Sequence, residues 1–113
     1  MKNIIFIVLI ITTSCYSSNF NELLFSGNCT ACHFKNKTVS APSVKEFKQR
    51  YITAFPDKKD FIKYISIWIQ HPKAETSLMQ DAIKKYELMP ELGFDLDTLE
   101  KISTYIYETD FTD

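Results

Sequence analysis

Five consecutive residues near the start of the chain, Cys29-Thr30-Ala31-Cys32-His33, constrain its fold and its chemistry more than any other stretch. Two thiols at this spacing can add across the two vinyl groups of a porphyrin, and a histidine directly after the second thiol is held where its ring can ligate the iron. The C-x-x-C-H pattern is the attachment signature of a c-type haem. The motif therefore predicts one covalently bound haem c, attached through Cys29 and Cys32, with His33 as an iron ligand.

Length and composition indicate one small globular domain. The chain has 113 residues, of which 45% are hydrophobic, and its formal net charge is −1. A domain of this size buries only a modest share of its surface, so the apolar face of a covalently held macrocycle would add to a limited core. The near-neutral charge gives no indication of a nucleic-acid partner, and we expect none.

The N-terminus has the pattern of an export signal. A short positive segment, residues 1–3, precedes an unbroken apolar run at residues 4–11, which is too short for the ~20 residues that span a bilayer. We therefore expect residues 1–14 to be a signal peptide and the mature protein to lie in a bacterial periplasm. Cys15 stands where a lipoprotein signal places its modified cysteine, so a lipid on Cys15 would tether the protein to the membrane. The alternative is cleavage a few residues later, for example after Ser17.

The rest of the chain predicts an all-α domain of about four to five helices wrapped around one haem, because apolar residues recur at helical spacing and no strand-length alternation is convincing. Capping residues place the expected helix starts near Asn19, Ser43, Asp57, Thr76 and Asp97. The third of these helices should end at His71, since a proline follows it. We expect the domain to cover residues 19–108 and residues 109–113 to form a frayed acidic tail.

A haem iron in an electron carrier needs a second protein ligand, and three residues are candidates. Met89 is favoured, because Pro90 after it disfavours helical geometry and places the thioether in an extended loop. Met79 is expected in mid-helix on an apolar face, where methionine usually fills core space. His71 has a suitable ring but stands at a helix end, where an exposed histidine is common.

Taken in order, these features resemble the class I monohaem c-type cytochromes. The resemblance depends on an apolar helix, the Cys29–His33 motif, the Met89-Pro90 loop and a last helix through Tyr105, although Phe34 replaces the glycine that usually follows the histidine. It implies that the first and last helices cross, with an aromatic pair near Phe25 and Tyr105. It also implies that the carbonyl of Pro42 orients the His33 ring from the side away from the iron.

The function expected from these residues is electron transfer without catalysis. With His33 and Met89 as axial ligands no position remains for a substrate, so we expect an electron carrier that exchanges electrons with donor and acceptor proteins of a respiratory chain. One alternative is a haem sensor or peroxidase-like protein with a labile sixth ligand. A second alternative is a haem-free exported protein in which Cys29 and Cys32 form a disulfide or a redox couple.

Overall fold

The computed structural model describes residues 17–112, and these residues form an all-helical domain with no strand among them. The expected all-α class is confirmed. The expected signal peptide at residues 1–14 and the candidate lipidation site Cys15 lie outside the described residues. The elements are α1 (Ser17–Asn28), α2 (Val44–Ala54), α3 (Lys58–Gln70), the short 3-10 helix η1 (Ala74–Thr76), α4 (Gln80–Tyr86) and α5 (Leu96–Glu108).

Two helix starts are fixed by side-chain caps that the sequence predicts. The Ser43 hydroxyl accepts a hydrogen bond from the backbone N–H of Glu46 at 3.1 Å and begins α2. The Asp57 carboxylate accepts from the backbone N–H groups of Lys59 and Asp60 and begins α3. Each cap satisfies donors that the first turn of a helix leaves without an intrahelical partner.

Other boundaries differ from the prediction. Asn19 lies within α1 and is not its cap, and α5 begins at Leu96 with Asp95 as its N-cap. The helix expected from Thr76 starts only at Gln80, so Met79 precedes α4 and does not lie in mid-helix. The reason is local: the Ser77 hydroxyl accepts from the backbone N–H of Met79 at 3.0 Å, and such bonds compete with helix formation.

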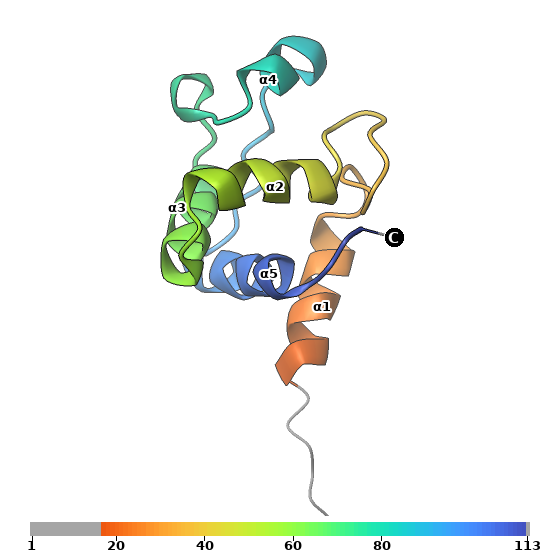
Figure 1. The fold of residues 1–113 in the computed structure, drawn as a ribbon, viewed down its shortest axis with the longest axis vertical. Helices are drawn as coiled ribbons and strands as arrows, with labels where there is room; N and C mark the ends of the chain where they lie inside the picture. The colour runs from red at the N-terminus through yellow and green to blue at the C-terminus, as the bar shows by residue number, and fades with distance from the viewer. Residues whose placement is uncertain (1–16, 113) are drawn as a thin grey trace, which may run out of the picture.

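The core lies where α1 and α3 pack against α5. Figure 1 shows α1 crossing α5, with α4 at the opposite end of the domain from α1. The rings of Phe25 and Tyr105 stand 5.1 Å apart at the crossing of α1 and α5, which confirms the expected aromatic pair. Two buried hydroxyls, Ser66 on α3 and Ser103 on α5, hydrogen-bond each other at 2.9 Å, and their small size lets the two helices approach closely. The buried apolar core comprises Phe25, Val44, Tyr51, Phe61, Ile65, Ile102, Ile106 and Phe111.

The segment after α5 packs against the domain, in contrast to the expected frayed tail. Phe111 is buried, and its ring stands 5.9 Å from that of Phe25. The Lys48 ammonium on α2 donates to the carbonyl of Thr109 and lies over the Phe111 ring. Residues 109–113 are polar or acidic except for one large apolar side chain, and burial of that side chain together with the Lys48 contacts packs the segment against the domain.

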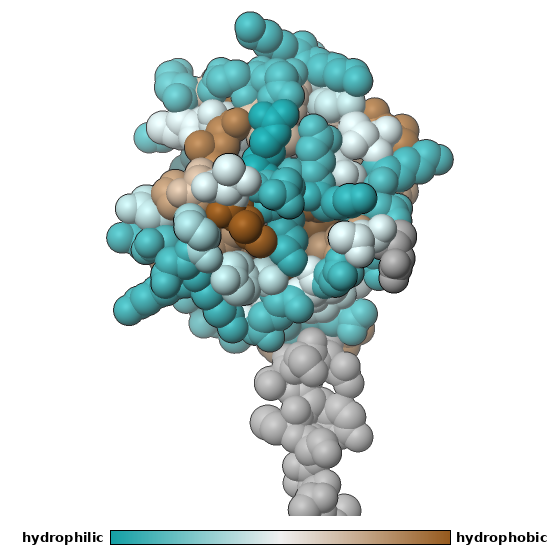
Figure 2. All heavy atoms as spheres, viewed as in Figure 1, coloured by the Kyte–Doolittle hydropathy of each residue, from teal (hydrophilic) through white to brown (hydrophobic). Residues whose placement is uncertain are grey.

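Hydrophilic side chains cover most of the face shown in Figure 2, with apolar patches between them. Several large apolar side chains are exposed, including Tyr64, Ile67, Leu78, Leu88 and Leu92. None of the helices in the described part of the chain has both the length and the apolar character needed to cross a bilayer.

Candidate functional site

The Cys29–His33 motif forms a turn directly after α1. The backbone N–H of Cys29 bonds to the carbonyl of Phe25 at 2.9 Å, and the N–H of His33 bonds to the carbonyl of Cys29 at 2.8 Å. Because Phe25 is fully buried, the turn is anchored to the core. Cys29 is half-buried and Cys32 is exposed. The structure thus brings the three motif residues together on one rigid turn.

His33 and Pro42 are joined by a hydrogen bond between the ring Nδ1 and the backbone carbonyl, 2.7 Å long. The loop that brings them together is held by two backbone bonds, from Val44 N–H to the carbonyl of Phe34 and from Lys45 N–H to the carbonyl of Lys35, both 2.9 Å. This is the contact that the family resemblance implies for Pro42.

The Pro42 bond decides which nitrogen of His33 can bind a metal. A carbonyl oxygen can only accept a hydrogen bond, so Nδ1 carries the proton and the lone pair of the neutral ring is on Nε2. Histidines that ligate metals through one nitrogen commonly donate the other N–H to a carbonyl or carboxylate. The Phe47 ring packs edge-on against the imidazole at 5.2 Å and restricts its rotation further. His33 is therefore oriented as a ligand that binds through Nε2.

The two thiols differ in environment. Burial raises the pKa of the Cys29 thiol to about 11, because a thiolate would lose hydration there. The attacking thiol of a disulfide-exchange site has a lowered pKa instead, which keeps it ionised near neutral pH. Cys29 therefore lacks the properties of an attacking thiol and has those of a structural or attachment thiol.

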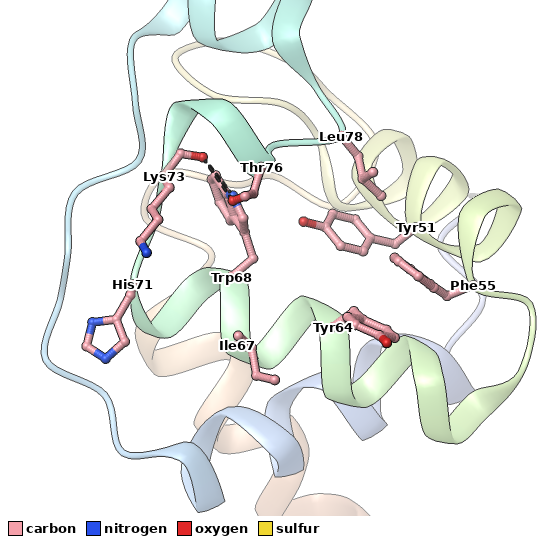
Figure 3. A pocket seen from close by; sticks show the side chains of 9 residues that line it. All are labelled: Tyr51, Phe55, Tyr64, Ile67, Trp68, His71, Lys73, Thr76 and Leu78. Atoms are coloured by element: carbon pink, nitrogen blue, oxygen red, sulfur yellow. Dashed lines mark hydrogen bonds between the residues drawn. The ribbon is translucent and has the colours of Figure 1, made fainter.

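An apolar pocket of about 370 Å³ opens between α2, α3 and the segment that follows α3. Figure 3 shows its aromatic walls facing one another, and the rings of Phe55 and Tyr64 stack at 4.4 Å. Phe47, Tyr51 and Phe55 recur at every fourth residue, so one face of α2 runs from the His33 contact to this pocket. The pocket is lined by Tyr51, Phe55, Tyr64, Ile67, Trp68, His71, Lys73, Thr76 and Leu78.

This pocket was not anticipated from the sequence. The signal that could have indicated it is the aromatic spacing at 47, 51 and 55, because aromatic side chains along one helical face are a common lining of apolar ligand pockets. The stacking partner Tyr64 lies on α3 and could not have been assigned without the relative placement of the two helices.

The three candidates for a second iron ligand are not brought to His33. Met89 is half-buried in the loop between α4 and α5, Met79 is buried just before α4, and His71 is exposed at the edge of the pocket. No hydrogen bond or aromatic contact within residues 17–112 joins any of them to the His33 ring. Nor do three or more His, Cys, Asp or Glu side chains cluster as a metal site in that part of the chain.

The donor set nevertheless fits a covalently attached haem. Such a group needs two thiols at C-x-x-C spacing and one imidazole with a free Nε2, and Cys29, Cys32 and His33 meet both requirements. At the other end of α2 from the His33–Phe47 contact, the apolar pocket offers aromatic faces of the kind that a porphyrin packs against. Searches of family models, curated proteins and solved structures return no match for this chain. We therefore infer its function from the motif and its surroundings.

Proposed function

We propose that this protein is an exported c-type cytochrome that carries electrons between redox partner proteins through one covalently bound haem c. The observation that carries the proposal is the hydrogen bond from His33 Nδ1 to the carbonyl of Pro42, next to Cys29 and Cys32. A histidine in this motif with its Nδ1 proton engaged and its Nε2 free has the arrangement that an axial ligand requires.

Each residue of the site would have a defined part. Cys29 and Cys32 would hold the haem through thioether bonds, which leaves it no route of dissociation. When bound, the haem supplies a one-electron couple at its iron. His33 Nε2 and the Met89 thioether would be the protein ligands of the iron. Aromatic side chains of α2 and α3 would exclude water, and Met/His ligation raises the reduction potential.

Electron transfer is favoured over catalysis because Met89 would fill the last coordination position of the iron. A substrate would then find no open site at the metal, and the chain would act only by accepting and releasing electrons. Lys35 and Lys37 are exposed in the loop directly after the motif. Their positive charges would steer an acidic surface of a donor or acceptor protein towards this end of the domain.

The proposed location is the bacterial periplasm. Both the attachment of haem c and the export signal expected at residues 1–14 favour that compartment. A lipid on Cys15 would hold the mature domain at the membrane surface. Such a lipid would need more than one acyl chain, because a single chain binds membranes only weakly. Mass spectrometry of the purified protein distinguishes a lipid-modified Cys15 from an N-terminus produced by later cleavage.

The direct test is a pyridine haemochrome spectrum of protein purified from a host with haem-attachment machinery, together with its intact mass. We expect one haem per chain and no alkylation of Cys29 or Cys32 after denaturation. A Cys32→Ser variant serves as the control, because it should bind through at most one thioether and show a shifted haemochrome band.

A colourless, correctly exported sample with both thiols free to alkylate would overturn the proposal. A colourless sample in which Cys29 and Cys32 instead form a disulfide would also overturn it and would support the haem-free alternative. Rapid binding of carbon monoxide to the reduced haem protein at neutral pH would indicate a labile sixth ligand, as in a sensor or peroxidase-like protein.

A further inference from the structure

The loop between α4 and α5 carries Met89 and has no helical structure of its own. The Glu87 N–H bonds to the carbonyl of Ile83 at 2.9 Å and ends α4, and Glu87 then adopts a positive φ of 72°. Gly93 has a positive φ of 74° near the other end of the loop. The conformation of residues 88–92 must therefore be held by contacts with another part of the domain.

Two adjacent side chains at the end of α3 provide such contacts. His71 Nδ1 lies 2.8 Å from Glu91 Oε1, and Gln70 Nε2 donates to the carbonyl of Phe94 at 3.5 Å. In Figure 3, His71 lies at the edge of the pocket, apart from the aromatic side chains. The end of α3 thus contacts both the centre and the far end of the Met89 loop.

The shorter of these contacts can form whether the histidine is neutral or protonated. A carboxylate can only accept, so Nδ1 carries the proton of the His71–Glu91 bond in both states. Prolines flank both partners, with Pro72 after His71 and Pro90 before Glu91. Because proline fixes its own φ and restricts the residue before it, the backbone at both ends of the bond has few alternatives.

We propose that the His71–Glu91 pair is a clamp that positions the Met89 loop and so governs how readily the Met89 thioether leaves the iron. This inference depends on the proposed function, since Met89 ligation is part of it. Glu91 is two residues from Met89, so a loop released from α3 would move the thioether with it. His71 and Glu91 act as positioning residues, and neither is a ligand.

The test uses the haem-loaded protein and two readouts. The first is the affinity of the oxidised form for added imidazole, which competes with Met89 for the iron. The second is native-state hydrogen exchange of the backbone amides of residues 88–94, excluding Pro90. An exposed pair has a modest effect, so His71→Ala and Glu91→Ala should each raise imidazole affinity about two- to fivefold and speed loop exchange by a similar factor. The double variant should show no larger increase than either single variant. Glu91→Gln keeps an acceptor oxygen, so it should show a smaller increase than Glu91→Ala.

Lys58→Ala is the matched control. Lys58 Nζ lies 3.0 Å from Glu108 Oε1, in another exposed ion pair that joins α3 to a different element, α5. This variant removes a contact of the same type far from the Met89 loop along α3. We expect it to leave imidazole affinity and loop exchange unchanged.

The possible outcomes distinguish a failure of the clamp proposal from a failure of the proposed function. Loop exchange that is unchanged in Glu91→Ala, or effects of the two alanine variants that simply add, would overturn the clamp. If the wild-type haem protein lacks the weak red absorbance band of methionine ligation, the Met89 assignment fails. Faster exchange of residues 88–94 in both alanine variants would still support the clamp in that case.

Discussion

The Nδ1 atom of His33 donates a hydrogen bond to the carbonyl oxygen of Pro42, nine residues later in the chain, at 2.7 Å. The contact depends on a loop that returns from the Cys29–His33 turn to the start of α2. Two backbone bonds between that loop and the first residues of α2 hold it in place. A proline at this position fixes φ, which removes one of the two backbone torsions that orient its carbonyl.

Pro42→Ala should loosen this bond without removing the carbonyl. The haem should still attach, because the thiols are unchanged, but a less firmly bonded imidazole is a weaker donor to iron. We therefore expect the reduction potential to rise, as measured by spectroelectrochemical titration. Pro56→Ala is the control, since the Pro56 carbonyl accepts a hydrogen bond from the Tyr107 hydroxyl, at 3.3 Å, away from His33. Equal shifts in the two variants would mean that the His33–Pro42 bond does not tune the ligand.

Met89→Ala and Met79→Ala separate the two methionines that could ligate the iron. Removing Met89 should abolish the red band of methionine ligation and lower the potential, because the thioether favours the reduced state. Met79 is buried, so Met79→Ala should cost about 2 kcal/mol of stability by leaving a cavity, and the band should stay. Absorbance and denaturant unfolding measure the two effects. Loss of the band in Met79→Ala alone would transfer the assignment to Met79.

The local features of this chain could be read from its sequence because they depend on neighbouring residues. The caps at Ser43 and Asp57 and the end of α3 before Pro72 follow from hydrogen-bonding capacity and proline geometry alone. The motif turn is equally local. The Phe25–Tyr105 pair was expected only through the family resemblance, since spacing alone does not say which helices cross.

What the sequence did not indicate depends on contacts between distant segments. The position of Phe111 against Phe25 and Tyr105 requires knowing where α5 ends relative to α1. The pocket between α2 and α3, and the contact of His71 with Glu91, likewise arise from tertiary placement. The start of α4 was misjudged because side-chain bonds at Ser77 and Gln80 compete with a helix that the apolar spacing favours.

Phe111→Ala tests whether the last residues belong to the domain. The ring is buried against Phe25 and Tyr105, so its removal should lower the free energy of unfolding by about 3 kcal/mol. Thr112→Ala is the control, because Thr112 is exposed and should change stability by less than about 0.5 kcal/mol. Urea unfolding followed by circular dichroism measures both. A Phe111→Ala variant as stable as the control would show that residues 109–113 are a free tail.

The attachment of α4 to α2 should depend on pH. The Arg50 guanidinium hydrogen-bonds Asp81 at 2.7 Å and 3.3 Å and lowers the pKa of that carboxyl below its ordinary value of 3.8. A carboxyl whose pKa is lower in the folded state stabilises the fold above its unfolded pKa, and this stabilisation is lost as the pH falls through the folded pKa. Wild type should therefore be more stable than Asp81→Asn at about pH 6, and the difference should shrink below about pH 4, as measured by urea unfolding. Arg50→Gln should behave in the same way. A stability difference between wild type and variant that stays constant at all pH values would contradict the role given to the Arg50–Asp81 contact.

Substitutions at Glu87 and Gly93, at the two ends of the Met89 loop, should change stability in opposite directions. Glu87 has φ 72° and ψ 174°, a region that side chains with a Cβ adopt at a cost of about 1–3 kcal/mol. Glu87→Gly should relieve this strain, and after the larger entropy loss of glycine on folding we expect about 1 kcal/mol of added stability. Gly93 has φ 74°, and no heavy atom stands within 4 Å of the position of an added Cβ, so Gly93→Ala should be destabilising through its backbone alone, by about 1 kcal/mol. Thermal unfolding of the haem-loaded protein shows whether each substitution raises or lowers stability. A Glu87→Gly variant less stable than wild type would show that the positive φ at this position carries no strain.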